Sequence, residues 1–198
     1  MKRRSLLALA GALAALPSLA FAQDEMLDRV TAYIDGLDTV VAEFRQGNPD
    51  GSISSGTFYM NRPGLMRFEY DLPNPAVVIA DGVWVAVVDR ASNAEPQRYP
   101  INSTPLRLLL RENVDFANDA SVRSVEERSG MLLVTVEDPD APENGTLELG
   151  FSQEPFALRE WAVTNGAGET TVVVIDSMER DVPLERRLFS IEWEALQR

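Results

Sequence analysis

Apolar and polar side chains alternate along residues 55–70, and this alternation predicts two β-strands joined by a tight Arg-Pro-Gly turn. Arg67 and Glu69 mark the outer face of the second strand. Arg62, just before the turn, shares the apolar face of the first strand, where a guanidinium needs hydrogen-bond acceptors. We expect the apolar face of the pair to line one concave surface, and it consists of Phe58, Met60, Met66, Phe68 and Tyr70.

Two other stretches have the apolar spacing of helices. Apolar residues recur at helical intervals over 25–37, with Val30 and Ile34 on the same stripe. A second, shorter helix is expected over 103–110, where Pro105 suits the first turn. The apolar side of this second helix carries Leu106, Leu109 and Leu110.

Short runs of alternating or apolar residues, separated by glycine, proline and asparagine turns, predict further strands. They cover residues 39–46, 77–80, 83–88, 121–128, 131–137, 146–151, 156–164, 170–176 and 188–193, with one more short strand ending at Tyr99. Many short strands and two helices indicate one antiparallel sheet, which curls as it grows. We therefore expect a mainly β protein with some α, an unclosed β-barrel whose short helices form a lid over a hydrophobic cavity. Val78 and Trp84 are expected to join the cavity wall.

Two of these strands do not have a clear inner face. The strand over 83–88 is apolar on both faces, so we expect it in mid-sheet with a helix or loop covering one side. In the strand over 156–164, Leu158 and Trp161 have opposite parity, so strict alternation cannot place both inside. The sequence leaves the orientation of this strand open.

Residues 1–22 have the pattern of a secretory signal peptide. A basic start precedes an apolar run and the small-x-small motif Ala20-Phe21-Ala22. An uncleaved membrane anchor is the weaker alternative, because the uninterrupted apolar run is too short to span a bilayer. We expect a single exported domain over 23–198. Loss of the three basic residues of the signal moves the net charge from −13 to −16, which argues against a nucleic-acid partner.

The chain contains no cysteine and no histidine. Without cysteine it forms no disulfide and carries out no thiol chemistry. Without histidine it lacks the commonest general base and the usual catalytic triads. We therefore expect neither a metal site nor a cofactor.

Acid–base catalysis by paired carboxylates is the competing enzymatic hypothesis. Asp138 with Asp140, or Glu126 with Glu127, could act in this way, although solvated loops and strand faces explain these residues better. The serine-rich stretch 51–56 does not fit a nucleophile elbow, and no histidine could activate it. We expect that the protein is not an enzyme.

Several motifs recur with the order and spacing of a known family. They are Phe44-Arg45-Gln46, Gly56-Thr57-Phe58-Tyr59-Met60-Asn61-Arg62-Pro63, Met66-Arg67-Phe68, Asp81-Gly82 and Thr104-Pro105-Leu106. In these motifs the chain resembles the outer-membrane lipoprotein carrier family, the periplasmic chaperone LolA, over roughly residues 25–165. The most specific part of the match is the Arg62-Pro63 turn, which is followed about twenty residues later by Asp81-Gly82 in a chain that begins with a signal peptide.

The resemblance implies an unclosed β-barrel with a helical lid over a hydrophobic cavity. It also implies a periplasmic chaperone that takes acylated lipoproteins from an inner-membrane ABC transporter complex. The chaperone shields their acyl chains and delivers them to an outer-membrane receptor lipoprotein. We also expect the protein to act as a monomer.

The resemblance further assigns roles to single residues. Arg62 matches the arginine that bonds backbone carbonyls of the lid and holds the cavity closed. Ile34, Leu109 and Leu110 match the lid positions that this arginine would reach. Met66 matches a bulky apolar position at the cavity entrance and Phe68 an aromatic residue of its wall.

Two other classes of function stay open at this point. One is a lipid-sensing or regulatory binding domain on the same scaffold, and the less favoured one is an exported hydrolase. Co-purification with a triacylated lipoprotein would favour the carrier. A soluble partner without lipid would favour the regulator, and ester hydrolysis the enzyme.

Overall fold

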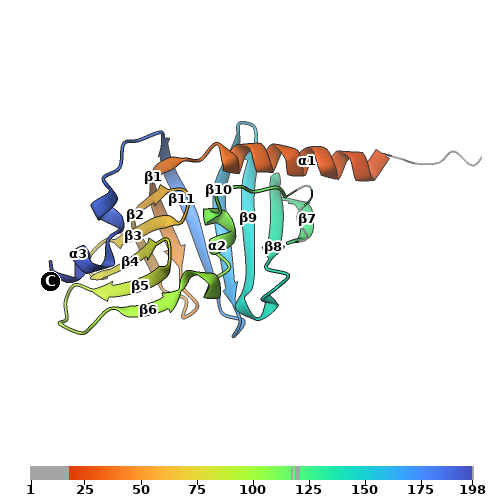
Figure 1. Ribbon diagram of the computed structural model, residues 1–198. Helices are drawn as coiled ribbons and strands as arrows, with labels where there is room; N and C mark the ends of the chain where they lie inside the picture. The colour runs from red at the N-terminus through yellow and green to blue at the C-terminus, as the bar shows by residue number, and fades with distance from the viewer. Residues whose placement is uncertain (1–17, 117, 119–120, 198) are drawn as a thin grey trace, which may run out of the picture.

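In the part of the chain that the structure describes, the fold is a single antiparallel sheet of 11 strands that curls around one hydrophobic core (Figure 1). The computed structural model describes residues 18–116, 118 and 121–197. The strand order is β6-β5-β4-β3-β2-β1-β11-β10-β9-β8-β7, so β6 and β7 are the two edges of the sheet. The expected unclosed β-barrel is therefore confirmed.

The elements follow one another along the chain, with short 3-10 helices marked η. The first half contains α1 (Ser18–Asp35), β1 (Thr39–Gly47), β2 (Ile53–Asn61), β3 (Leu65–Tyr70), β4 (Ala76–Asp81), β5 (Trp84–Asp89), β6 (Gln97–Pro100), η1 (Ile101–Ser103) and α2 (Arg107–Leu110). The second half contains β7 (Val122–Arg128), β8 (Met131–Glu137), η2 (Pro142–Asn144), β9 (Gly145–Gln153), β10 (Phe156–Asn165), β11 (Thr170–Arg180), η3 (Arg186–Phe189) and α3 (Ile191–Ala195).

The helix α1 begins within the predicted signal peptide, whose residues 1–17 lie outside the described residues. It starts at Ser18, earlier than the expected 25–37 helix, and no proline between Pro17 and the end of α1 interrupts it. No helix among residues 18–116, 118 and 121–197 is long and apolar enough to cross a membrane.

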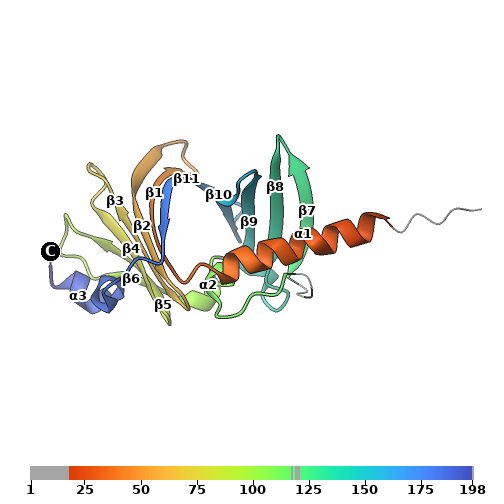
Figure 2. The same cartoon turned by 90° about the horizontal axis from the view of Figure 1, so that it is seen from above.

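The concave side of the sheet is covered by α1, α2 and the chain that follows α2. In Figure 1, α1 crosses the upper ends of β7 to β10, and α2 lies between the two halves of the sheet. Figure 2 shows the same halves from above, with α1 and α2 on one side of them. These segments and the inner faces of the strands form one buried apolar cluster.

The hairpin expected over residues 55–70 is formed by β2 and β3. Phe58 pairs with Phe68, and Met60 with Met66, so the four side chains lie on one face. All four are at most 5% exposed and belong to the core on the concave side. The prediction that alternation places these residues together is confirmed.

A β-bulge resolves the conflicting parity of the strand β10. The register with β9 shifts between Leu158 and Glu160, so two residues oppose one on the partner strand. After this shift both Leu158 and Trp161 point inward, and both are buried. A one-residue slip exchanges the two faces of a strand, which is why strict alternation could not place both residues.

The predicted strand over 188–193 is wrong. These residues form the end of η3 and most of α3, which pack on the outer face of β3, β4 and β5. The side chain of Ser190 caps α3 by accepting a hydrogen bond from the backbone N–H of Trp193 at 3.2 Å. Ile191 then fills an apolar patch on that outer face, which is completed by Val77, Ile79 and Ala86.

The docking of α3 explains the strand that is apolar on both faces. Ala86 and Val88 of β5 are buried on the outer side, facing the C-terminal helices, while Val85 faces the cavity. The expected cover on one side of 83–88 is therefore present, although β5 lies next to the edge strand β6 rather than in mid-sheet. The predicted 103–110 helix is also shorter than expected, since only 107–110 are α-helical.

Replacing Gly56 with alanine is expected to destabilise the sheet. A Cβ atom at this position of β2 would lie 2.1 Å from the backbone oxygen of Glu69, which cannot move without disturbing the pairing with β3. We expect the free energy of unfolding in urea to fall by about 1–3 kcal/mol. Gly47→Ala is the matched control, because nothing lies within 4 Å of a Cβ atom there. Equal losses in the two variants would contradict this explanation.

Candidate functional site

A cavity of about 260 Å³ lies between the inner face of the sheet and the segment that carries α2. Its wall comes from strands of both halves of the sheet, so the curling of the sheet creates it. The lining residues are Gln46, Met66, Phe68, Tyr70, Val78, Val85, Thr104, Leu106, Leu110, Trp161, Val163, Thr171 and Val173. Most of them are apolar, as in sites that bind hydrocarbon groups.

The structure brings most of the predicted wall residues to this cavity. Those that line it directly are Met66, Phe68, Tyr70, Val78 and Leu106, together with the lid residue Leu110. Phe58, Met60 and Leu109 lie in the surrounding core, where each is at most 2% exposed. They pack beside the wall residues in the same core. Val30 and Ile34 of α1 are fully buried in the same core.

The prediction that Trp84 lines the cavity is wrong. Trp84 shares the parity of Ala86 and Val88, which face the outer side of β5, and its side chain is 40% exposed. Its neighbour Val85 faces the cavity instead. Because 83–88 is apolar on both faces, the type of residue gave no signal of which parity points inward.

Sequence reasoning also missed the second half of the wall. Trp161, Val163 and Val173 come from β10 and β11, beyond the stretch where the motifs are densest. Their apolar character was visible in the sequence, but the bulge in β10 hid the inner face of that strand. Gln46, Thr104 and Thr171 were missed because polar side chains are not expected in an apolar wall.

The guanidinium of Arg62 joins the ends of α1 and α2. Its Nη1 donates to the carbonyl of Ile34 in the last turn of α1, and its Nε donates to the carbonyl of Arg111 at 3.1 Å. Nη2 also donates to the carbonyl of Arg111, and Glu112 O and Asp35 Oδ1 lie at 3.5 and 3.4 Å from it. The side chain is only 4% exposed. Carbonyls at helix C-termini lack helical partners and favour a cation, so Arg62 satisfies both ends at once.

The lid can now be defined as α1 together with residues 106–116. The two parts are also joined by direct hydrogen bonds. The carboxylate of Asp35 accepts from the backbone N–H of Val114 at 3.2 Å, and the hydroxyl of Thr31 accepts from the backbone N–H of Phe116 at 3.0 Å. The carbonyl of Leu110 accepts from the N–H of Gly64 at 3.0 Å. The expected contact of Arg62 with Ile34 is thus present, whereas its acceptors on the α2 side are residues 111 and 112 rather than 109 and 110.

Two further side chains fix the lid to the sheet. Arg107 of α2 pairs with the carboxylate of Asp138, at the end of β8. This hydrogen bond from Arg107 is the largest cause that holds the pKa of Asp138 below its ordinary value. On α1, the guanidinium of Arg29 lies 4.1 Å from the ring centre of Phe156. The carboxylate of Asp138 is therefore occupied in anchoring α2.

One end of the cavity carries polar groups. The hydroxyl of Tyr70 donates to Oε1 of Gln46 at 2.9 Å, and Nε2 of Gln46 donates to Oδ1 of Asn48 at 2.7 Å. Burial raises the pKa of Tyr70 above its ordinary value, although the hydrogen bond with Gln46 opposes the change. The phenol is therefore neutral at physiological pH.

A family model described as outer membrane lipoprotein carrier protein LolA matches residues 35–192, which include the cavity wall, Arg62 and α2. The chain belongs to the LolA family. It is 30% identical over 192 residues to an outer-membrane lipoprotein carrier protein of Dechloromonas aromatica, covering 89% of this chain and 86% of that protein. It is 25% identical to the protein of the same name from Cupriavidus taiwanensis, over 96% of this chain and 94% of the other.

Solved structures share the LolA-family fold at low sequence identity. A putative outer membrane lipoprotein-sorting protein domain from Vibrio parahaemolyticus aligns with a TM-score of 0.50 and 11% identity. The alignment covers 90% of this chain and all of that one. At this identity the likeness concerns the fold alone.

Proposed function

We propose that this protein is a periplasmic chaperone that binds the acyl chains of lipoproteins and carries them from the inner membrane to the outer membrane. The observation that supports this function most strongly is the apolar cavity beneath a lid that a single buried arginine bridges. Membership of the LolA family supports the same function. The carrier would receive its cargo from an inner-membrane ABC transporter complex, act as a monomer and deliver to an outer-membrane receptor lipoprotein.

The physical chemistry of the cavity suits an acyl chain. Each methylene group transferred from water to an apolar site contributes about 0.8 kcal/mol, so part of one chain already gives useful affinity. A carrier must also release its cargo, and hydrogen bonds from Arg62 to the lid favour the closed arrangement over one that admits a chain. The lid is then a two-state element, in which cargo favours the open form and Arg62 the closed form.

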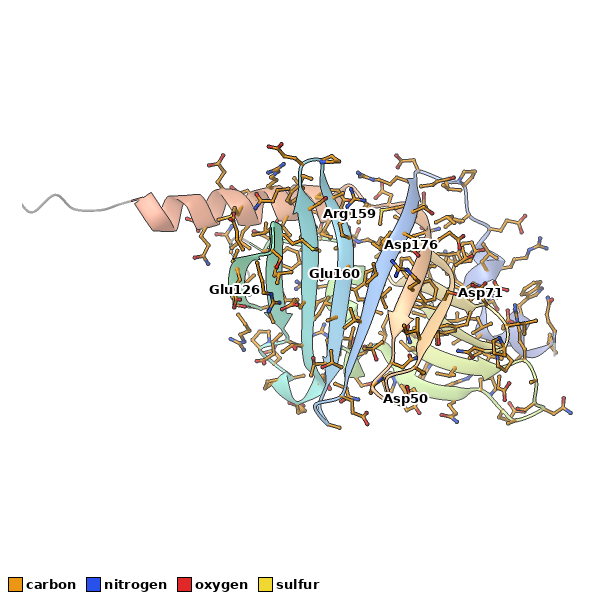
Figure 3. The ribbon with its side chains drawn as sticks, turned by 180° about the vertical axis from the view of Figure 1, so that it is seen from behind. Asp50, Asp71, Glu126, Arg159, Glu160 and Asp176 are labelled. Carbon is orange, nitrogen blue, oxygen red and sulfur yellow. The ribbon has the colours of Figure 1, made fainter. Side chains whose placement is uncertain are left out.

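The carboxylates considered for catalysis have structural explanations. Asp138 is paired with Arg107, and its Oδ1 accepts a hydrogen bond from the backbone N–H of Asp140 at 3.1 Å. Glu126 and Glu127 lie on the edge strand β7, and Figure 3 shows Glu126 on the outer side of the molecule. These groups lie outside the apolar cavity, so a non-enzymatic carrier accounts for the site better than a hydrolase.

Incubation of the purified protein with spheroplasts that contain a competent transporter tests this function. We expect a labelled triacylated lipoprotein to appear in the supernatant in a soluble complex with the protein. Val163→Asp should reduce release strongly, because an ionised carboxylate in the cavity opposes an acyl chain. Val83→Asp is the matched control, since Val83 is 63% exposed on the surface. Absence of lipoprotein release by the unmodified protein would refute the proposal.

A further inference from the structure

Three polar side chains of the cavity, those of Gln46, Tyr70 and Thr171, lie at the end of the sheet away from Arg62. Gln46 and Tyr70 lie near the C-terminal ends of β1 and β3, and Thr171 lies at the start of β11. Gln46 pairs with Val173, the neighbour of Thr171 on the same face of β11. Figure 3 shows Asp50, in the turn after β1, at the lower edge of the sheet and α1 at the upper edge. The cavity therefore has a lid end at Leu110, next to the Arg111 carbonyl that Arg62 binds, and a polar end at Gln46.

A chain of hydrogen bonds fixes the polar end. Gln46 accepts from Tyr70 and donates to Asn48, whose Nδ2 donates in turn to the hydroxyls of Ser52 at 3.0 Å and Ser54 at 3.1 Å. An amide has two N–H groups, so one N–H of Gln46 remains after the bond to Asn48. The hydroxyl of Thr171 makes no hydrogen bond to any residue that the structure describes. Held donors of this kind bind an acceptor with little loss of side-chain freedom.

The donors at this end are all neutral. The residues that line the cavity include no lysine, arginine, aspartate or glutamate. A neutral carbonyl oxygen can accept hydrogen bonds here, whereas an ionised carboxylate would enter an apolar site without a cation to pair with. The chemistry therefore favours an acyl chain in ester or amide linkage over a free fatty acid.

The polar end also leads towards the surface. A second pocket, of about 420 Å³, shares Val85, Thr104 and Val163 with the cavity. Its remaining lining is mostly polar and comes from β6, the chain before α2, and the two turns that flank β9 and β10 near Thr171: Tyr99, Ser103, Pro105, Glu143, Asn144, Asn165 and Gly166. A hydrophilic head group can thus lie in this second pocket while its acyl chain occupies the cavity.

We propose that Gln46 and Thr171 bind the carbonyl oxygen of an ester- or amide-linked acyl chain. The methyl end of the chain points towards Met66 and Leu110, and the head group leaves through the second pocket. This assignment rests on the proposed carrier function. It adds the direction in which the chain lies in the cavity and the chemical linkage that the site recognises. The apolar wall contributes affinity, and the polar end contributes selectivity for the linkage.

Binding of three probes of equal chain length tests the assignment. The probes are 1-lauroyl glycerol, the ether 1-O-dodecyl glycerol, which lacks the carbonyl, and laurate at pH 8. We expect the ester to bind about threefold to tenfold more tightly than the ether, as one net hydrogen bond allows. Laurate should bind most weakly. Thr171→Val and Gln46→Leu should each reduce the preference for ester over ether without weakening the ether.

Thr170→Val is the matched control, because Thr170 is exposed on the other face of β11. It should keep the preference. Equal binding of ester and ether by the unmodified protein, or a preference unchanged in both Thr171→Val and Gln46→Leu, would overturn the assignment. In either case, lipoprotein release from spheroplasts would still support the carrier function. Failure to bind any probe, together with failure to release lipoprotein, would overturn both.

Discussion

Replacement of Arg62 with leucine is expected to slow the release of bound lipoprotein about a hundredfold while leaving loading intact. Hydrogen bonds from a charged donor contribute roughly 1.5–3 kcal/mol each, and Arg62 makes such bonds to the ends of both α1 and α2. If closing the lid is favoured by about 3 kcal/mol through these bonds, cargo binding is weakened by a factor of about 100. Leucine removes this opposition, so the bound complex persists.

The slower release expected for Arg62→Leu comes from the lid, because the buried guanidinium of Arg62 binds the carbonyls at the ends of α1 and α2. The carbonyls of Ile34 and Arg111 lie at helix ends, where water can replace the guanidinium once the lid opens. Leucine also extends the apolar surface towards the cavity, which favours bound hydrocarbon further. The dissociation rate of a labelled lipoprotein from the purified complex, measured with and without the outer-membrane receptor, gives the size of the change.

Two variants serve as controls for Arg62→Leu. Arg62→Lys should have an intermediate rate, because a lysine lacks the planar fork that reaches two helix ends at once. Arg45→Leu removes an arginine from the outer face, where Arg45 pairs with the carboxylate of Asp176 at 2.7 Å and is 58% exposed. That variant should release cargo at the normal rate. A normal release rate for Arg62→Leu would show that Arg62 does not control the lid.

Much of the concave side of the fold could be predicted from the sequence. A half-buried antiparallel strand shows its inner face as an alternation, so Phe58, Met60, Met66 and Phe68 could be placed together. The same alternation placed Arg62 on the inner side, where its need for acceptors was evident. Local pattern did not identify these acceptors, because the ends of α1 and α2 meet Arg62 only in the folded chain. The family resemblance supplied that expectation.

The rest could not be predicted because it depends on contacts between distant segments. Residues 188–193 alternate like a strand, yet Ser190 caps a helix and Ile191 packs on the outer face of β4 and β5. The same contact makes the outer face of β5 apolar, which is why Trp84 and Val85 could not be distinguished. The bulge after Leu158 likewise changes which residues of β10 face inward, and no residue type near it indicates that a bulge is present. Tertiary contacts override local propensity at these positions.

Replacement of Glu194 with alanine is expected to lower the free energy of unfolding by about 3–5 kcal/mol, the usual effect of breaking a buried ion pair. Glu194, in α3, is fully buried and lies 2.9 Å from the guanidinium of Arg67, which is 2% exposed. Its other oxygen accepts from Arg90 at 2.5 Å, and both arginines also pair with Glu69. Removal of Glu194 leaves Arg67 buried with less compensation for its charge. Denaturation in urea measures the loss.

The neighbouring Glu192 is the natural control for this network. It is 67% exposed and pairs with Arg98 at 3.2 Å, so Glu192→Ala should change the free energy of unfolding by less than about 1 kcal/mol. The double variant Arg67→Met with Glu194→Leu should lose less than Glu194→Ala alone, because neither charge is left unpaired. Equal effects of Glu192→Ala and Glu194→Ala would contradict the role of the buried pair.

Since Met66 and Phe68 flank Arg67 on the same strand, loss of α3 from the outer face should also loosen the cavity wall and weaken acyl binding.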